Sequence, residues 1–549
     1  MALLRGADAL ERARSLFQDP KAIVGVEADR DSRGAPPRVI ALGTANDSLA
    51  IDVAGTPGMT ALLGAHDRPF GAVHAKALHR VLLRLGEGPL PSRWADAVIA
   101  EQLLLGGREG SIDPDAVAMR HLREPLPSAE TGLESLKARA SAIARLVAAQ
   151  IPRLREDELV LTSRLEAAAV APIAEMEAKG MPFDAQRWKG IDAEVRAEQK
   201  DLRAKIMPHF AKVTGNDLFG GATLNLDNDN ELKKALAAIG HRVENAKRET
   251  LQRLPEPLGP LLARYREVMK LVSAYGEAFL EYVGADGRLH PTFTQIGANT
   301  GRMACHSPNL QSMVKDSPHR TCFRVAEDRA LVTADYGACE LRIIAELSGD
   351  PVFAEAFARG EDLHARVATA IFGKPVSKNE NPELRQRAKA VNFGLAYGMG
   401  AQGLARAIDT DVNQARQLLE RYFKSFPRIR AFLERSAEEG LSRGFARTMT
   451  GRRLYLEGER SQLERIAKNM PIQGTNADIT KIALARLRGR LGTDRLVNVV
   501  HDEIVCECAK VEAEDVATAM REEMVAAGAQ VLKTIPLTVD VSVGEIWGK

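Results

Sequence analysis

Two short segments carry carboxylates that could hold a metal ion. Asp335 ends an apolar run in L-V-T-A-D-Y-G, and the segment Arg495–Cys508 reads R-L-V-N-V-V-H-D-E-I-V-C-E-C. Apolar runs flank His501, Asp502 and Glu503, which predicts a tight hairpin with the acids at its tip. A lone aspartate after a strand is more often a helix cap, and H-D-E alone occurs by chance in many chains. Acids at a buried hairpin tip cost desolvation unless they are paired or metal-bound, so both segments are candidate metal sites.

A third segment, Asn381–Gly398, places cations and aromatic rings on one stripe. Four side chains recur at every fourth position, namely Arg385, Lys389, Phe393 and Tyr397. On a helix this spacing puts them on one face. Two cations followed by two rings suit a nucleoside triphosphate, because the charges can meet phosphates and a ring can meet the base. A solvated basic face with a core aromatic pair explains this segment equally well when it is taken alone.

A fourth segment, Glu464–Lys481, repeats the four-residue spacing with polar side chains at Arg465, Asn469 and Gln473. Buried amides on a helix usually serve core hydrogen bonding, so this segment by itself is weak evidence for a site.

Local patterns predict the elements that position these residues. A strand should end at Asp335, with a helix resuming near Glu340. Asn381 is the expected N-cap of the basic helix, with Pro382 at its first position. Upstream, a long amphipathic helix is expected over about 159–179, ending at Gly180 and Pro182. Residues 184–285 are highly charged and mostly helical in pattern, with capping side chains at 225–230 before a helix at 231–239.

The first 150 residues read as a small α/β domain. Apolar runs at 23–26, 39–42 and 49–53 alternate with turn residues and predict strands. Helical periodicity follows at about 74–85 and 94–105.

Bulk properties set limits on the class of protein. A length of 549 residues suggests three or four domain-sized units, and a net charge of +2 does not by itself reveal a nucleic-acid partner. The five cysteines form no C-x-x-C pair, which favours reduced thiols and argues against zinc. No run of eighteen apolar residues and no signal-peptide layout is present, so we expect no membrane span and a cytoplasmic protein, in a bacterial cell or a phage-infected host.

Together the four segments resemble, in order, the signature motifs of family A (DNA polymerase I-like) DNA polymerases. D-Y-x-x-x-E-L-R is similar to the first palm motif, R-x-x-x-K-x-x-x-F-G-x-x-Y-G to the fingers motif, and V-H-D-E to the second palm motif. Further matches are N-T-G-R (299–302), P-N-L-Q (308–311), D-L-H (362–364), G-R-R-L-Y-L (451–456) and G-E-I-W (544–547). The resemblance covers about 159–549.

The resemblance implies a multidomain fold of α/β and α+β parts, a right-hand polymerase with palm, fingers and thumb. Residues 151–549 would form the polymerase domain, with the thumb at about 184–285, the palm at about 286–350 and 465–549, and the fingers at about 351–464. Residues 1–150 more faintly resemble the family's RNase H-like 3′–5′ exonuclease domain. We expect this large-fragment organisation without the family's 5′-nuclease domain.

The resemblance also implies attack of a primer 3′-hydroxyl on the α-phosphate of a deoxynucleotide, assisted by two Mg²⁺ ions, with Mn²⁺ as an alternative. Asp335, Asp502 and the backbone carbonyl of Tyr336 are the implied metal ligands, and Glu503 is expected to lie behind them. Lys389 is the implied acid that protonates the departing pyrophosphate.

The implied substrates are deoxynucleoside triphosphates and primer-template DNA, bound by a monomer. Arg385, Lys389 and His364 would grip the triphosphate. Phe393 would stack near the sugar and base, and Tyr397 would border the template position. The implied DNA-contacting residues are Arg302 and Gln473 in the minor groove, assisted by Asn469 and Arg465, with His501 near the primer terminus. Every correct base pair presents an acceptor in that groove, so probing it tests pair geometry without selecting a sequence.

We expect no proofreading. The stretch V-G-V-E-A-D-R holds Glu27 and Asp29 in inverted order relative to the family's D-x-E, and His79 stands where a second acid is expected. Neither a Y-x-x-x-D nor an H-x-x-x-x-D motif occurs in the region, so two cations could not be held close together. Whether Glu27 and Asp29 still bind one ion stays open.

Two rival functions are weaker. Glu340 resembles the family's steric gate against a ribose 2′-hydroxyl, whereas single-subunit RNA polymerases carry a small residue there. An inactive DNA-binding scaffold would be expected to lack a palm aspartate or the fingers lysine, and all are present. Replication, gap filling and lesion bypass, and any clamp-like accessory protein, are left open by the sequence.

Overall fold

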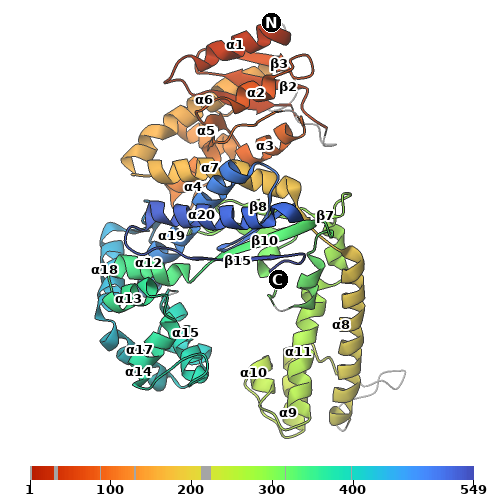
Figure 1. Ribbon diagram of the computed structural model, residues 1–549, viewed down its shortest axis with the longest axis vertical. Helices are drawn as coiled ribbons and strands as arrows, with labels where there is room; N and C mark the ends of the chain where they lie inside the picture. The colour runs from red at the N-terminus through yellow and green to blue at the C-terminus, as the bar shows by residue number, and fades with distance from the viewer. Residues whose placement is uncertain are drawn as a thin grey trace. The chain divides into compact units, whose positions relative to one another are not determined.

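The computed structural model describes residues 3–29, 35–86, 88–128, 132–211, 224–315, 317–396 and 398–548 (Figure 1). The chain forms two compact units. The larger comprises Met1–Gly180, Pro291–Gln311 and Glu327–Lys549, and the smaller comprises Met181–His290 and Ser312–Ala326. No described helix combines the length and apolarity that a membrane crossing requires.

The larger unit begins with a five-stranded sheet of order β3-β2-β1-β4-β5. Its strands are β1 (Gly25–Ala28), β2 (Val39–Gly43), β3 (Ser48–Asp52), β4 (Phe70–Ala72) and β5 (Trp94–Asp96). The first three pair antiparallel, whereas β4 and β5 run parallel to β1. The helices around it are α1 (Gly6–Phe17), α2 (Met59–Gly64), α3 (Ala75–Leu83), α4 (Ala97–Leu105), α5 (Pro114–Leu122) and α6 (Leu133–Glu156).

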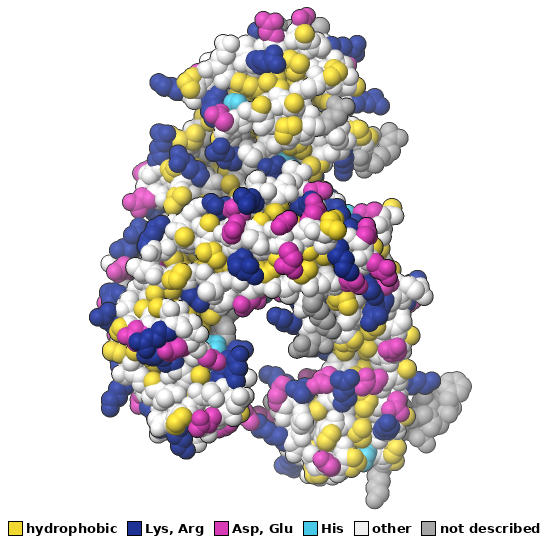
Figure 2. Space-filling model, viewed as in Figure 1, with side chains coloured by type: hydrophobic (Ala, Val, Ile, Leu, Met, Phe, Trp, Pro, Cys, Tyr) yellow, Lys and Arg dark blue, Asp and Glu magenta, His cyan; other side chains and the backbone are white. Residues whose placement is uncertain are grey.

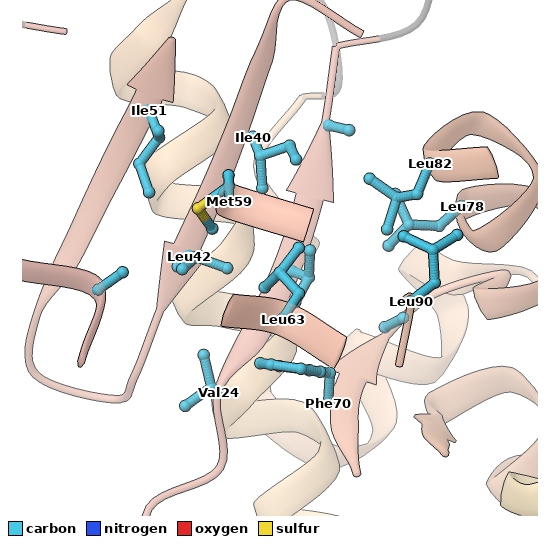
Figure 3. Close-up of a cluster of buried hydrophobic side chains, with 14 of the residues drawn as sticks. Val24, Ile40, Leu42, Ile51, Met59, Leu63, Phe70, Leu78, Leu82 and Leu90 are labelled. Carbon is cyan, nitrogen blue, oxygen red and sulfur yellow. The ribbon is translucent and has the colours of Figure 1, made fainter. Parts of the chain in front are cut away.

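Apolar side chains of this sheet and its helices form one core. Figure 3 shows Ile40, Leu42 and Phe70 from the strands facing Met59 and Leu63 from α2. The other face packs on α6 at very short range. A Cβ at Gly25 would lie 2.0 Å from the Ala140 oxygen, and one at Gly43 would lie 2.5 Å from the Ser141 nitrogen. Only glycine therefore lets α6 pack this close to the sheet.

One predicted helix starts later than the periodicity suggested. Residues 94–96 were expected to begin a helix, but they form the edge strand β5. Trp94 is fully buried against the sheet core, and the Asp96 carboxylate caps α4 by accepting from the Val98 and Ile99 amides at 2.8 and 3.3 Å. The N-cap aspartate marks the true helix start, and burial of the tryptophan favours the strand before it.

A second sheet, of order β13-β14-β10-β15, forms the middle of the larger unit, and its described neighbours all pair antiparallel. The strands are β10 (Arg329–Tyr336), β13 (Leu496–Val500), β14 (Glu503–Ala509) and β15 (Val539–Gly544). Around it pack α7 (Val160–Lys179), α12 (Cys339–Ser348), α19 (Arg460–Leu491) and α20 (Ala513–Val531). Short hairpins are formed by β8 (Thr292–Thr294) with β9 (Ala304–His306) and by β11 (Phe445–Arg447) with β12 (Arg453–Tyr455).

A helical region follows α12. It comprises α13 (Pro351–Ala358), α14 (Leu363–Phe372), α15 (Pro382–Ala396), α16 (Ala401–Ala407), α17 (Val412–Ser425) and α18 (Pro427–Arg443). Pro382 opens α15 as predicted, but the Asn381 side chain does not act as the predicted cap. Its amide nitrogen donates to the Pro375 carbonyl at 2.8 Å, and Asn381 itself has a φ of 52°. Asparagine tolerates this left-handed conformation, and its side-chain hydrogen bond holds the loop before the helix in place.

The smaller unit is mainly helical. It contains α8 (Ala185–Ile206), α9 (Asp229–Ala238), α10 (Arg248–Leu251) and α11 (Leu258–Tyr275), with β6 (Met181–Pro182) paired to β7 (Arg288–Leu289). Asn228 caps α9 within the predicted capping stretch. Trp188 is fully buried and stacks on Phe279 with ring centroids 4.3 Å apart, so aromatic packing holds α8 in this unit.

Candidate active site

The predicted carboxylates meet at one end of the central sheet. Asp335 is the penultimate residue of β10, where it stands opposite Glu503 of β14 and Asp540 of β15. Asp502 precedes Glu503 in the turn that joins β13 to β14, as the hairpin pattern predicted. His501 takes a φ of 57° to close that turn. Asp502 therefore lies one residue before the position of β14 that pairs with Asp335.

The surroundings of Asp502 favour a bound cation. Burial and the nearby Glu340 carboxylate raise the pKa of Asp502 to about 6, although Arg302 and Asn476 oppose the shift. Keeping a carboxylate charged in such a place requires a compensating positive charge. The described residues include no group of three or more His, Cys, Asp or Glu side chains placed to hold a metal. Magnesium is usually held by one or two carboxylates together with substrate phosphates and water, which these two aspartates fit.

Glu503 and Tyr336 anchor the same end of the sheet from behind. The Trp547 indole nitrogen donates to the Glu503 carboxylate at 2.7 Å, and both side chains are buried. The Tyr336 hydroxyl donates to the Met524 carbonyl at 2.7 Å. These contacts fix the two strand ends that carry Asp335 and Asp502.

Glu340 lies in the first turn of α12 and forms an ion pair with Arg302. Glu340 is 6% exposed, and burial raises its pKa, although the charge of Arg302 opposes the shift. Its second carboxylate oxygen has no hydrogen-bond partner among the described residues. The pair therefore stands between the sheet end and the loop that carries Arg302.

The predicted cations of α15 lie beside α14. The Arg385 Nε donates to Asp362 at 2.7 Å, and Asp362 also caps α14 by accepting from the His364 amide at 3.0 Å. His364 Nδ1 lies 3.0 Å from the Asn392 amide nitrogen. Burial, together with the charges of Arg385 and Lys389, lowers the pKa of His364 to about 4, although the charge of Asp362 opposes the shift. The structure thus groups three of the predicted phosphate-binding side chains.

Two further predicted residues of this stripe cannot be placed. Tyr397 lies outside the described residues, and the side chain of Phe393 is likewise not described.

The polar stripe of α19 faces the Arg302 loop. Gln473 is 6% exposed and Asn469 is half-buried, whereas Arg465 is exposed. A Cβ at Gly474 would lie 2.4 Å from Thr448 Cγ2 and 3.0 Å from the Thr300 oxygen, so this glycine allows α19 to touch the loop. The helix therefore brings Gln473 close to the chain segment of Arg302.

Asn476 belongs to this site and was missed by the sequence reasoning. It lies close enough to Asp502 to oppose the rise in the pKa of that carboxyl, is 4% exposed, and has an amide oxygen without a partner among the described residues. Asn476, Arg302 and His501 line one small cavity. Asn476 follows Gln473 by three residues and so lies on the same face of the helix, a spacing from which the sequence could have identified it as a site residue.

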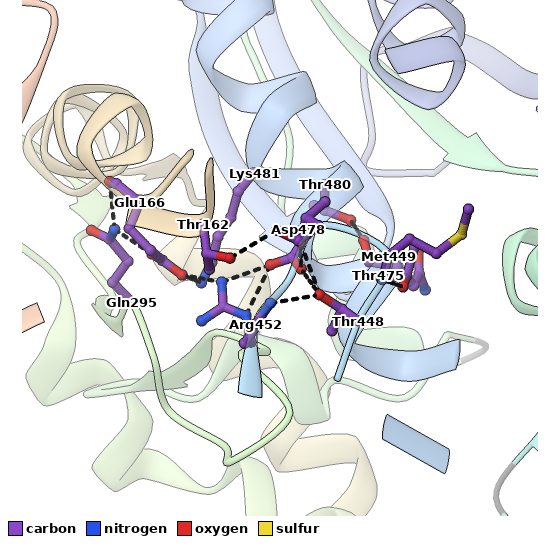
Figure 4. A network of polar contacts seen from close by, with 12 residues as sticks. Thr162, Glu166, Gln295, Thr448, Met449, Arg452, Thr475, Asp478, Thr480 and Lys481 are labelled. Carbon is purple, nitrogen blue, oxygen red and sulfur yellow. Dashed lines mark hydrogen bonds and ion pairs between the residues drawn. The ribbon is translucent and has the colours of Figure 1, made fainter. Parts of the chain in front are cut away.

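A buried ionic network behind the site was also missed (Figure 4). The Arg452 Nε donates to Asp478 at 2.9 Å, Arg452 also pairs with Glu166 of α7, and the Lys481 Nζ donates to Glu166 at 2.5 Å. All four side chains are at most 3% exposed. Burial lowers the pKa of Lys481 to about 8.

This network supports the Arg302 loop directly. Gly301 has a φ of 90°, and a Cβ there would lie 2.5 Å from Arg452 Nε. The guanidinium group thus occupies the space beside the residue that precedes Arg302.

The candidate exonuclease residues are engaged within the protein. Glu27 forms an ion pair with Arg139 at 2.8 Å, and Asp29 accepts from the Arg38 and Val39 amides at 2.8 Å. His79 is fully buried, with Nε2 at 3.0 Å from a Glu175 oxygen, and its Nδ1 accepts from the Trp94 indole at 3.0 Å. Because Nδ1 is the acceptor, the proton sits on Nε2 and is donated to Glu175.

The family model of DNA polymerase family A matches residues 193–549, well over half of the chain. The chain belongs to DNA polymerase family A. This family A chain is 34% identical over 483 residues to the thermostable DNA polymerase I of Thermus filiformis, covering 81% of this chain and 56% of the relative. It is 32% identical over 442 residues to DNA polymerase I of Aquifex aeolicus, covering 78% of this chain and 74% of that relative. It thus spans a little over half the length of the Thermus relatives.

The family A fold is also seen among solved structures. The POL domain of Pol1 from M. smegmatis, in a complex with DNA primer-template and dNTP, superposes with a TM-score of 0.83 at 28% identity. The match covers 99% of each chain. The mixed α/β polymerase fold expected from the motifs is therefore confirmed.

Proposed function

We propose that this protein is a template-directed DNA polymerase that adds deoxynucleotides to a primer 3′ end. The observation that carries the proposal is the placement of Asp335 and Asp502 at the same end of adjacent strands. The family, and a similar solved structure that holds DNA primer-template and dNTP, supply the substrate class. The proposed partners are primer-template DNA and deoxynucleoside triphosphates, bound by a monomer.

The proposed domains follow from these elements. The four-stranded sheet with α19 and α20 would be the palm (about 286–350 and 465–549), and α13–α18 the fingers (about 351–464). The helices α8–α11 would be the thumb (about 184–285). Residues 1–150 would be an RNase H-like exonuclease-type domain, a proposal supported by the mixed sheet order β3-β2-β1-β4-β5.

Asp335, Asp502 and the backbone carbonyl of Tyr336 would hold the two magnesium ions. When bound, such ions promote loss of the proton from the primer hydroxyl and neutralise charge on the leaving pyrophosphate. Asn476 would orient the Asp502 carboxylate, and Trp547 holds Glu503 behind it. The chain thereby positions both aspartates before substrate arrives.

Arg385, Lys389 and His364 would bind the triphosphate oxygens from one side. Asp362 orients Arg385 through its 2.7 Å hydrogen bond, and Asn392 orients His364. Lys389 would donate a proton to the departing pyrophosphate. Phe393 would stack near the sugar and base, and Tyr397 would border the template position.

The DNA would be contacted from α19 and the Arg302 loop. Arg302 and Gln473 would donate to the minor-groove acceptors that all correct pairs share, with Asn469 and Arg465 assisting. His501 would lie near the primer terminus. The 6% exposure of Gln473 leaves its side chain little freedom, which suits a probe of pair geometry.

Primer extension tests this function. Purified protein with a primer-template, Mg²⁺ and one deoxynucleotide at a time should extend the primer only with the complementary nucleotide. No extension, or extension that ignores the template, would contradict the proposal. Parallel assays on undamaged, gapped and lesion-bearing templates would assign the cellular role.

We expect Glu340→Ala to increase ribonucleotide incorporation by about 100-fold, because a steric barrier beside the sugar C2′ is removed. Glu340→Gln is the matched control, since it keeps the size of the side chain and should retain the discrimination. Competition between deoxy- and ribonucleotides in single-nucleotide insertion measures the ratio. Equal selectivity in the alanine variant and the parent would place the barrier elsewhere.

We expect the purified protein not to shorten a mismatched primer in Mg²⁺ without nucleotides. Glu27 is paired with Arg139, and His79, which by the resemblance stands where a second acid is expected, is buried. A labelled mismatched primer followed on a denaturing gel measures the reaction. Shortening from the 3′ end that is lost in a Glu27→Ala, Asp29→Ala double variant would show that a metal site persists there.

A further inference from the structure

We propose that a pocket near the start of the chain binds a small amphipathic anion, an apolar ring compound that carries one carboxylate. The pocket has a volume of about 290 Å³ and is lined only by residues between 20 and 167. Its walls come from the segments that lead into β1 and β4, from β5, and from helices α4, α6 and α7. No residue of the candidate polymerase site lines it, so the proposal goes beyond the proposed function.

The interior of the pocket is apolar. Its wall is formed mainly by Ile23, Trp94, Ile99, Val147, Ile151 and Leu154. Trp94 and Leu154 are buried, at 0% and 6% exposure, so the wall is part of the packed core and not a loose surface groove. A volume near the lower end of the range for small-molecule sites suits a compact ring body.

The mouth of the pocket is positively charged. Lys21, Arg155 and Arg164 line it, are exposed, and make no ion pair with any part of the chain that the structure describes. The acid in the lining, Asp96, is already engaged by the backbone amides of Ala75 at 2.6 Å and Val98 at 2.8 Å. The unmatched cations therefore favour an anionic group on the occupant.

Gln150 contributes a fixed polar group to the wall. It is 1% exposed, and its amide nitrogen donates to the Ala97 carbonyl at 3.0 Å and to Glu101 at 3.2 Å. Its amide oxygen is buried without a partner among the described residues and presents almost no surface to the pocket. Recognition of the occupant therefore depends on the apolar wall and on the cations at the mouth.

The binding test uses the whole protein and three probes in isothermal titration. Indole-3-acetate and 1-naphthaleneacetate each join an apolar ring to a carboxylate, and tryptamine carries a cation in place of the anion. We expect both carboxylates to bind and tryptamine not to bind. Absence of binding by both carboxylates, or equal binding of tryptamine, would overturn the proposal.

Two variants locate the binding. Arg155→Ala with Arg164→Ala should weaken indole-3-acetate binding about tenfold or more, and Ala100→Phe, which fills the pocket, should abolish it. Both variants should extend primers like the parent, because they leave the candidate polymerase site untouched. Unchanged affinity in the double variant would show that the probe binds elsewhere and would overturn the proposal. If the parent protein does not extend primers, that result counts only against the proposed polymerase function.

Discussion

Replacing Asp335 or Asp502 by asparagine is expected to lower the rate of nucleotide addition by about 1000-fold or more. Effects of this size occur in phosphoryl transfer when a group that neutralises transition-state charge is removed. Both substitutions keep the side-chain shape and remove the negative charge that would hold magnesium. Single-turnover primer extension measures the rate. A DNA-binding titration should show nearly unchanged affinity for primer-template, because phosphate contacts contribute most of that affinity. A rate within about tenfold of the parent would contradict the metal assignment.

Asp540→Asn is the matched control. Asp540 stands beside Asp335 on the neighbouring strand β15, in register, but it is exposed. The variant removes one charge at the same level of the sheet and should retain primer extension.

The Asp502 variant also has an expected effect on stability that does not depend on activity. Burial raises the pKa of Asp502 from 3.8 to about 6, so the folded protein binds this proton more tightly than the unfolded chain. The stability from that proton is present below about pH 4 and is lost as the pH rises through about 6. At pH 8 without metal, Asp502→Asn should therefore melt at a higher temperature than the parent, and the difference should shrink at pH 4. Added Mg²⁺ should raise the melting temperature of the parent more than that of the variant.

Arg452→Met is expected to destabilise the larger unit by about 3–5 kcal/mol, because it leaves Glu166 and Asp478 buried without their shared cation. Arg452 is 3% exposed on its side chain and lies behind Gly301, so primer extension should also fall as the Arg302 loop loses its support. Thermal or urea unfolding, followed at the first transition of this multidomain chain, measures the loss.

Arg460→Met is the matched control for this prediction. The Arg460 side chain is 83% exposed and pairs with Glu464 within one helix at 3.1 Å. Exposed pairs of this kind contribute less than about 1 kcal/mol. Similar unfolding midpoints for the two variants would show that the buried network does not hold the site together.

Local sequence determined much of the framework of the candidate site. The strand through Asp335, the hairpin with Asp502 at its tip and the start of α15 at Pro382 all lie where the pattern predicted them. These features depend on alternation, turn residues and capping within about ten residues of one another, which the chain encodes locally. Local rules were insufficient at residues 94–96. Their periodicity predicts a helix, but they form a strand because Trp94 is buried against the sheet.

Tertiary structure alone decided which distant groups meet. Arg302 pairs with Glu340 across 38 positions, and Arg452 pairs with Glu166 across 286 positions. Asn476 comes close to Asp502 only because α19 packs beside the hairpin. The pocket near Lys21 and Arg164 exists only where five segments of the chain, within 20–23, 68–69, 94–100, 147–155 and 160–167, converge. The packing of whole helices and strands decides which of these groups come into contact. Periodicity and spacing along the chain therefore do not predict which buried charges form pairs.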